Sequence, residues 1–151
     1  MTKGVRRAAA TSHGVRLEIV ERLDPAAVVA LYQAGGWWKE SRAWRAQIPK
    51  MIEGSLVFVT ATTREGRVVG MGRAISDGAS DAYIQDVVVM RELRGHGIGA
   101  RIISRLVREL RRRKVGWIGL VAEPGTTRFY RRLGFEPLVG YQPMLFQGKA
   151  S

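Results

Sequence analysis

The sequence contains no cysteine and only two histidines, His13 and His96. The lack of thiols excludes disulfides, thiolate metal ligands and a cysteine nucleophile, and two histidines are too few for a multi-histidine metal site. No apolar run approaches the roughly 18 residues that a membrane-spanning helix needs. We therefore expect no metal, no membrane partner and, by default, a cytoplasmic location.

Acidic residues are scarce. Thirteen Asp and Glu stand against 25 Lys and Arg, which gives a formal net charge of +12. A field of this sign attracts polyanions such as nucleic acid, anionic lipid or an anionic cofactor, and the charge alone does not choose among them. Arginine-rich proteomes also produce basic proteins that have no nucleic-acid role.

The length of 151 residues, 46% of them hydrophobic, suits one domain of ordinary size. Residues 1–14 are basic and rich in small side chains, without the apolar core of a secretory signal. We expect a flexible N-terminal arm over 1–14 and a single domain over 15–148.

Hydrophobic periodicity predicts a mixed α/β domain. Asp24 and Ser41 are favourable helix caps, Gly35-Gly36 ends the first helix, and Pro49 bends or interrupts the second. The expected order is a strand at 15–20, helices at 26–33 and 41–53, strands at 56–62, 67–75 and 82–90, a helix at 97–115, a strand at 117–122, a short helix at 124–133, and strands at 135–138 and 141–146.

The segment Arg94-Gly95-His96-Gly97-Ile98-Gly99 lies between a predicted strand and the long predicted helix. Glycines let the backbone approach a ligand closely, and a helix N-terminus supplies unpaired N–H donors with partial positive charge. The combination predicts a diphosphate site, with Arg94 adding charge at its rim. The alternative is a glycine-rich turn that only caps the helix. A Walker A loop is excluded, since Ala100-Arg101 follow in place of Lys-Ser/Thr.

This segment resembles the Arg/Gln-x-x-Gly-x-Gly/Ala signature of the GNAT superfamily of acyl-CoA-dependent N-acyltransferases, and Val87-Val88-Val89 stand where its preceding strand is expected. Phe129-Tyr130-Arg131-Arg132-Leu133-Gly134-Phe135 is similar to a second element of that family, Phe-Tyr-x-x-Leu-Gly-Phe. The resemblance covers roughly 17–146 in element order and is specific over about 85–135. Arg91 replaces a frequent proline, and Glu123-Pro124-Gly125 replaces a common asparagine.

The resemblance implies a mostly antiparallel sheet of about six or seven strands flanked by about four helices. It also implies direct transfer of an acetyl group from acetyl-CoA to a primary amine in a ternary complex. Tyr130 would protonate the departing thiolate, and a backbone N–H of Val88 or Val89 would bind the oxyanion. The implied cofactor contacts are Val87, Val88, Val89, Arg94, Gly95, His96, Gly97, Ile98, Gly99, Ala100 and Phe129.

Three features near the predicted strand 82–90 concern the acceptor amine. Asp86 is the candidate base, acting through water, although it could equally bind a cationic substrate or an arginine. Because strand residues alternate, either Asp86 or Gln85 is expected to face the cleft. Trp37 and Trp38 are candidate substrate-binding residues through cation–π contact, and Gln85 is a third candidate because it could face the cleft. The alternatives are that the tryptophans are core and that Tyr130 is a packing residue.

Two other functions stay open at this stage. One is a non-catalytic acyl-CoA sensor of the same fold. The other is a basic nucleic-acid-binding module that uses the arginines of 105–114. The acceptor would be a small-molecule or a protein amine, and a homodimer is a further possibility.

Overall fold

A computed structural model of the chain describes residues 14–148, so the N-terminal arm expected over 1–14 lies almost wholly outside the described residues. The chain divides into two compact units, with the boundary between Leu120 and Val121. Each unit is described by itself.

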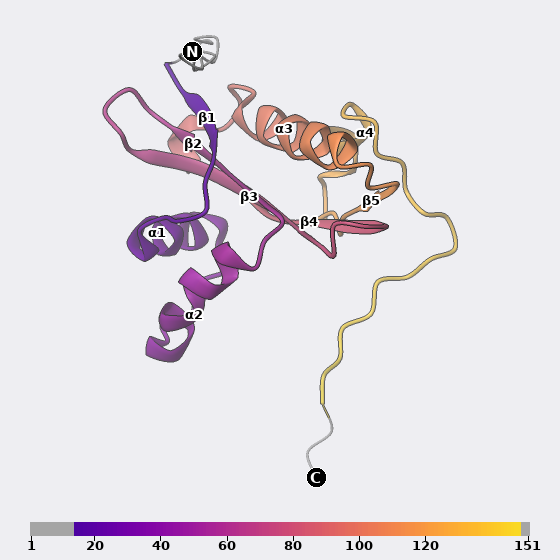
Figure 1. Cartoon of the computed structure of the whole chain (residues 1–151), viewed down its shortest axis with the longest axis horizontal. Coiled ribbons are helices and arrows are strands. Elements are labelled where there is room, and N and C mark those ends of the chain that lie inside the picture. Colours follow the sequence, from indigo (N-terminus) through magenta and orange to yellow (C-terminus); the bar gives the residue numbers. More distant parts are fainter. Residues whose placement is uncertain (1–13, 149–151) are drawn as a thin grey trace, which may run out of the picture. The chain divides into compact units, whose positions relative to one another are not determined.

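The first unit is built on a single sheet with the strand order β1-β2-β3-β4-β5 (Figure 1). Antiparallel pairing joins β1 to β2, β2 to β3 and β3 to β4, whereas β4 and β5 are parallel. The sheet is therefore mostly antiparallel, as expected. Its strands are β1 (Arg16–Ile19), β2 (Val57–Thr62), β3 (Val68–Ser76), β4 (Asp81–Val89) and β5 (Trp117–Gly119).

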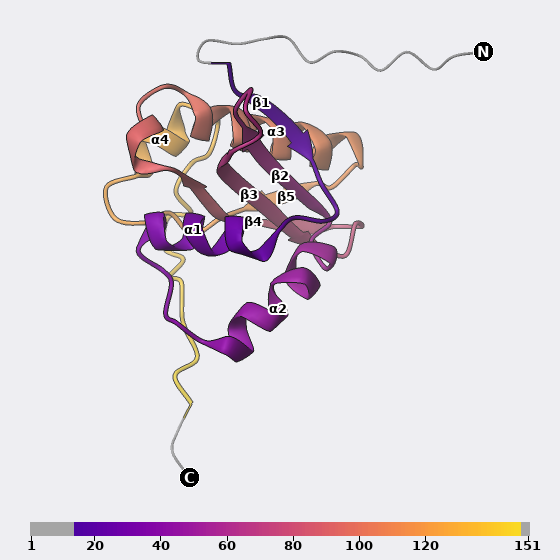
Figure 2. The ribbon, with the colours of Figure 1, turned by 90° about the vertical axis from the view of Figure 1, so that its left-hand side faces the viewer.

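Helices cover both faces of this sheet. Helices α1 (Pro25–Gly35) and α2 (Arg42–Glu53) lie on one face, and α3 (Ile98–Arg112) lies on the other (Figure 2). A short 3₁₀ turn, η1 (Arg91–Leu93), connects β4 to the loop before α3. With α4 (Thr127–Arg131) in the second unit, the helix count agrees with the expected four.

The predicted helix ends are confirmed in the first two helices. Asp24 accepts a hydrogen bond from the Ala26 N–H at 2.9 Å, and the Ser41 hydroxyl accepts one from the Trp44 N–H at 3.2 Å. Gly36 takes the left-handed conformation, with φ 76°, at the end of α1. Pro49 lies inside α2 without interrupting it.

Each face of the sheet has its own apolar layer. Met71 and Val88 pack with α1 and α2 in one buried cluster. On the other face β3 presents Gly70 and Gly72, and a Cβ added at Gly72 would lie 2.7 Å from Ile102 Cγ2. These glycines therefore let α3 lie close to the sheet. The predicted apolar face of α3 is confirmed, because Ile98, Ile102, Leu106 and Leu110 are all buried.

The predictions for the last third of the chain are partly wrong. Among residues 14–148, segments 135–138 and 141–146 form no strand, and the strand predicted at 117–122 ends at Gly119. An apolar alternating segment forms a strand only where a neighbouring strand pairs with it. Here Gly140 adopts φ 81°, which is not a strand conformation, and Pro143 has no N–H to donate to a neighbouring strand. The described sheet thus has five strands instead of six or seven.

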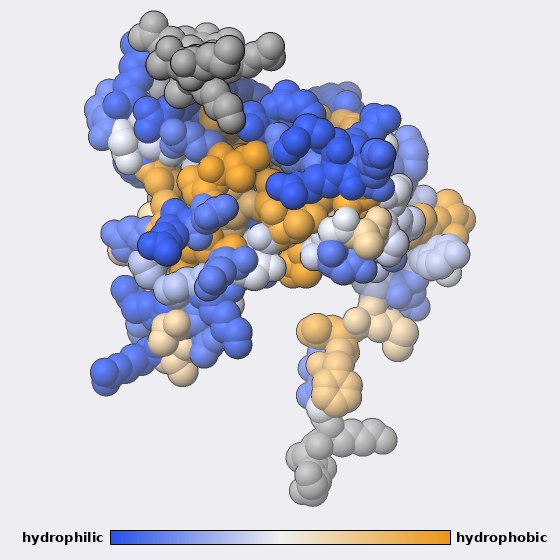
Figure 3. Space-filling view, in the orientation of Figure 1, coloured by the Kyte–Doolittle hydropathy of each residue, from blue (hydrophilic) through white to orange (hydrophobic). Residues whose placement is uncertain are grey.

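Large apolar side chains of this C-terminal segment are exposed, and they are visible in Figure 3 as a run of apolar colour along the chain end. They are Leu138, Val139, Tyr141, Met144, Leu145 and Phe146. The predicted short helix is also trimmed, from 124–133 to Thr127–Arg131.

Two findings apply to the described range alone. No helix within 14–148 combines the length and the apolar character needed to cross a bilayer. The same residues contain no group of three or more histidine or acidic side chains placed to hold a metal ion.

Candidate active site

The glycine loop lies between η1 and α3. Gly95 and Gly97 both adopt left-handed backbone, with φ 80° and 79°, and an added Cβ at either would meet nothing within 4 Å. The first bond back along the helix runs from the Arg101 N–H to the Gly97 carbonyl at 3.1 Å. The N–H groups of Ile98, Gly99 and Ala100 therefore precede the helical ladder. They lie at the positive end of α3, where an anion would be stabilised.

Arg94 holds this loop against α1. Its Nε donates to the Val89 carbonyl at 3.0 Å and its Nη2 to the Ala34 carbonyl at 2.9 Å. Arg91 Nε reaches the same Ala34 carbonyl at 3.3 Å. Both carbonyl acceptors are uncharged, so the Arg94 guanidinium keeps its positive charge beside the loop. The His96 ring is tied back by a contact of Nδ1 with the Leu93 carbonyl at 3.1 Å.

Strand β5 pairs with only the first part of β4, far from this loop. Their pairing runs only from Asp81 to Tyr83 on β4. Val88 lies opposite Met71 on β3, and the Met90 N–H donates to the Val69 carbonyl at 2.8 Å. Because backbone groups in an antiparallel strand alternate in direction, those of Val88 face β3 and those of Val89 face the side of β5. The Val89 N–H is therefore directed toward the edge of β4 that β5 leaves unpaired, which is called the gap below.

A β-bulge in β4 positions Asp86. Met71 pairs with Val88 and Arg73 with Gln85, so Gly72 alone opposes two residues of β4. Asp86 adopts a left-handed conformation there, with φ 56°, which aspartate tolerates better than most residues. Alternation predicts that one of Asp86 and Gln85 faces the cleft. The bulge instead places both on the face of the sheet that carries Arg73.

The Asp86 carboxylate joins a half-buried polar network. Its Oδ2 accepts hydrogen bonds from Arg73 Nε at 2.6 Å and from the Tyr32 hydroxyl at 3.0 Å. The Arg73 side chain is 14% exposed and that of Asp86 is 22% exposed. Within residues 14–148, Oδ1 of Asp86 accepts no hydrogen bond. Of the roles left open for this carboxylate, contact with an arginine is therefore observed.

Tyr32 is fixed as a donor in this network. Burial, and then the negative charge of Asp86, raise the pKa of Tyr32 well above its ordinary value. The phenol therefore stays protonated at neutral pH and acts as a hydrogen-bond donor.

Three tryptophans surround the Tyr32 ring. The ring centroids of Trp37, Trp38 and Trp44 lie 6.0, 6.4 and 6.2 Å from that of Tyr32. Trp38 packs partly against the core cluster, whereas Trp37 and Trp44 are each 38% exposed. Arg45 lies over the Trp38 ring at 5.9 Å. Trp38 is thus partly core, whereas Trp37 and Trp44 form a partly exposed surface, here called the open aromatic wall. A role of this wall in substrate binding stays a prediction.

Tyr32 and Arg73 are site residues that the sequence analysis missed. Arg73 is the only charged residue in β3, among valine, glycine and methionine. A charge in a buried strand requires a partner, so this position carried a usable signal. Tyr32 lies in the apolar face of α1 and had no comparable signal.

Tyr130 and Phe129 belong to the second unit. The Tyr130 ring lies between Phe129, 5.1 Å away at 74°, and Phe135, 6.0 Å away at 79°. Burial, and then the charge of Glu123, raise the pKa of Tyr130 above its ordinary value. The phenol therefore stays protonated, and so uncharged, at neutral pH.

Comparison with known proteins places the chain in a family. The model of the acetyltransferase (GNAT) family matches residues 17–135. A GNAT-family acetyltransferase from Streptococcus pneumoniae superposes with a TM-score of 0.77 at 25% identity, over 90% of this chain and 99% of that one. Glucosamine-6-phosphate N-acetyltransferase from Arabidopsis thaliana shares the fold, with a TM-score of 0.65 at 14% identity over 88% of this chain and 99% of that one.

Sequence relatives match over shorter stretches. GCN5-related N-acetyltransferase 2, chloroplastic, of Arabidopsis thaliana is 44% identical over 73 residues, or 48% of this chain and 28% of that protein. Serotonin N-acetyltransferase 2, chloroplastic, of Oryza sativa is 43% identical over 76 residues, or 50% and 38%. The matches thus span well under half of these relatives. The chain belongs to the GNAT acetyltransferase family.

Proposed function

We propose that the chain is an N-acetyltransferase, which transfers an acetyl group from acetyl-CoA to a primary amine by direct attack in a ternary complex. The observation that carries this proposal is the left-handed Gly95–Gly97 loop at the start of α3, next to the end of β4 that β5 leaves unpaired. An anion site and an open strand edge thus adjoin each other, as a diphosphate with a linear amide arm requires.

The residues of the loop fit the diphosphate of acetyl-CoA. Ile98, Gly99 and Ala100 supply backbone donors, Gly95 and Gly97 leave open space, and Arg94 supplies charge. Oriented N–H groups at a helix N-terminus stabilise a phosphate in this way. The backbone of Val87 would receive the amide arm next to Val89, and Phe129 and His96 are further proposed contacts.

Stabilisation of the oxyanion is assigned to the Val89 N–H. A donor at this position must be free of the β-ladder, and the backbone of Val88 is turned toward Met71. Val89 instead faces the gap beside β5. A donor fixed in advance at the developing negative charge lowers the barrier to acyl transfer.

Proton transfer is assigned to two side chains. Tyr130 gives its proton to the departing thiolate, since the phenol is still protonated at neutral pH when the thiolate forms. Asp86 receives the proton of the amine through a water. Arg73 and Tyr32 hold its Oδ2 in place, which leaves Oδ1 for this step.

The acceptor amine is assigned to the open aromatic wall. Trp37 and Trp38 lie at the α1–α2 connection beside Tyr32, and Gln85 shares the sheet face of Asp86. Aromatic faces attract alkylammonium groups and stack on aromatic amines. One relative is named for serotonin and another, from Glycine max, is named a histone acetyltransferase. Both an indole amine and a lysine peptide therefore belong in an acceptor panel.

The test is release of CoA thiol from acetyl-CoA, measured with a panel of small amines, serotonin and lysine peptides. We expect turnover with at least one acceptor. A matched variant, Gly97→Asp, should lose CoA binding, because it places a strained side chain and a negative charge at the diphosphate. Unchanged CoA affinity of this variant by calorimetry would contradict the loop assignment. CoA binding without turnover on any amine would favour an acyl-CoA sensor.

A further inference from the structure

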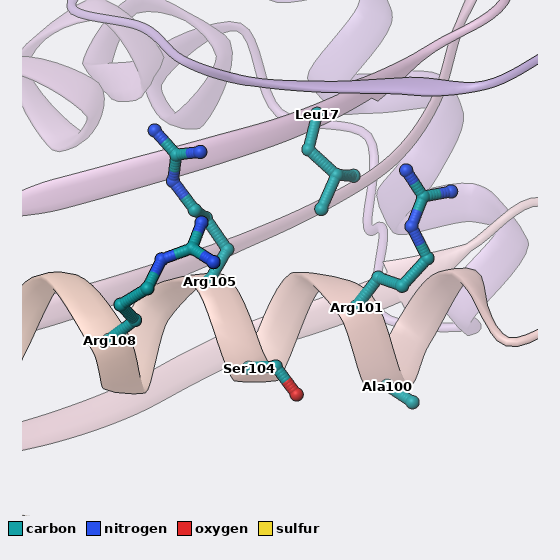
Figure 4. Close-up of a pocket in the computed structure, with 6 residues that line it drawn as sticks. All are labelled: Leu17, Ala100, Arg101, Ser104, Arg105 and Arg108. Atoms are coloured by element: carbon teal, nitrogen blue, oxygen red, sulfur yellow. The ribbon is translucent and has the colours of Figure 1, made fainter. Parts of the chain in front are cut away.

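A cavity of about 320 Å³ lies between α3 and β1, and it shares Ala100 alone with the site described above. Figure 4 shows Arg101 and Arg105 extending from α3 on either side of Leu17, with Ser104 between them on the helix. Ala100 and Arg108 complete its lining. None of the loop residues 94–99 contributes to it, and neither do the aromatic residues around Tyr32.

The positive charges that line this cavity outnumber the negative charges that are paired with them. Arg101, Arg105 and Arg108 follow the i, i+4, i+7 spacing of one helix face. Arg101 donates from Nη2 to the neutral Val15 carbonyl at 3.1 Å. Arg108 makes no ion pair with any carboxylate in residues 14–148. Among the described residues, the ion pair of these three arginines joins Arg105 to Glu109, which also pairs with Arg112. Three guanidinium groups thus line the cavity, and the one carboxylate paired with them is also shared with Arg112.

Arg105 also has an unmet hydrogen-bonding group. Its Nε is buried and donates no hydrogen bond, since Glu109 Oε1 stands at 3.5 Å in unsuitable geometry. The charge of Arg105 is therefore paired with Glu109 without a hydrogen bond from Nε. Clustered like charges on one helix face repel one another, and an anion between them removes this repulsion.

We propose that this cavity binds the phosphate group of a small phosphorylated metabolite. Guanidinium forks match phosphate oxygens in pairs, and the Ser104 hydroxyl adds a donor. Leu17 and Ala100 provide an apolar surface for the rest of the molecule. The volume lies at the lower end of small-molecule sites, which fits a compound smaller than a nucleotide. This site shares Ala100 alone with the proposed acetyl-CoA site and does not rest on the proposed function.

The experiment is calorimetric titration of the whole chain with inorganic phosphate and with glucose 6-phosphate at constant ionic strength. We expect one site for each probe. Arg108→Gln should weaken binding about tenfold or more, which is the loss of one charge-assisted hydrogen bond. Arg111→Gln, an exposed arginine of the same helix that does not line the cavity, is the matched control and should change affinity less than twofold.

Three results would overturn the proposal. The first is no heat of binding with either probe. The second is equal weakening by both variants, which would indicate attraction by net charge alone. The third is loss of phosphate binding when CoA is saturating, which would make the cavity part of the cofactor site. Arg105→Gln is a second variant, useful only if its melting curve matches that of the wild type, because Arg105 also contacts Glu109.

Discussion

Asp86 combines three properties that rarely occur together in one residue. Its backbone is left-handed, it lies at a bulge, and its carboxylate joins an arginine to a tyrosine. Strained backbone at a non-glycine residue persists where the surroundings hold it, often at functional sites. The network with Arg73 and Tyr32 supplies that support.

The variant Asp86→Asn tests the negative charge of residue 86 while it keeps the size and shape of the side chain. Asparagine tolerates left-handed backbone and fills the same space, so the substitution removes chiefly the negative charge beside Arg73. We expect a loss of about 2 kcal/mol in the free energy of unfolding, measured in urea, since a half-buried arginine loses its partner. Turnover should fall as well if Asp86 receives the amine proton.

Tyr32→Phe is the control for that experiment, because it removes one hydrogen bond to Asp86 and leaves the ion pair intact. It should cost about 1 kcal/mol. An Asp86→Asn variant as stable as the wild type would show that the Arg73–Asp86 pair contributes nothing to the fold.

Tyr130→Phe tests the proposed acid. The phenol supplies a proton to the leaving thiolate, so its removal should lower kcat on the order of a hundredfold or more. The affinity for CoA should stay within a factor of two, since no cofactor contact is assigned to the hydroxyl. Steady-state kinetics and calorimetry on the same preparation separate the two quantities. Equal kcat in both proteins would remove Tyr130 from the mechanism.

At the scale of elements, the contact of α3 with β3 depends on missing side chains. Gly70 and Gly72 lie under Ile102 and Leu106, and an added Cβ at Gly72 would approach Leu106 Cδ1 to 3.1 Å as well. Close packing of a helix on a strand therefore fixes the direction of α3, and with it the direction of the N–H groups at its first turn.

Gly72→Ala should destabilise the protein by about 1–3 kcal/mol, because overpacking forces the helix or its side chains to move. Gly116→Ala is the matched control. An added Cβ there meets nothing within 4 Å, so its effect on the urea midpoint should be small or slightly stabilising. Equal midpoints for the two variants would contradict the tight contact.

Local sequence rules predict the first four strands and the long helix well, because alternation, caps and the 3.6-residue period are properties of neighbouring residues. The bulge at Asp86 could not be predicted in this way, since it depends on the register between β3 and β4. The strands expected at 135–138 and 141–146 failed for a related reason. Their pattern is apolar, but a strand needs a partner that the pattern does not specify.

The residues of the candidate site also divide into those that local sequence predicts and those that only the fold brings together. The glycine loop was predictable because its residues are contiguous and their conformation is intrinsic to glycine. The Tyr32–Asp86–Arg73 network joins three distant segments, so only the fold brings it together. The sequence alone did not show that Arg94 uses its side chain to hold the loop against Ala34.

At the scale of the molecule, the net charge of +12 is the dominant long-range property. Much of it lies on α3 and its C-terminal end, where Figure 3 shows hydrophilic side chains gathered over the helix. A field of one sign accelerates the arrival of anionic ligands and is screened by salt.

CoA affinity should therefore fall as ionic strength rises, with most of the change in the association rate. Stopped-flow binding at low and high sodium chloride, with sucrose as an uncharged control, measures this. An association rate that does not depend on salt would show that the basic surface takes no part in cofactor capture.

The gap between β4 and β5 has a consequence for amide hydrogen exchange. The Val88 N–H faces Met71 in the ladder and should exchange slowly, whereas the Val89 N–H faces the gap and should exchange quickly. Two adjacent amides with opposite protection form an internal reference. A ligand seated along β4 would slow exchange at Val89 and leave Val88 unchanged, so this pair of amides reports occupancy of the site without any label on the ligand.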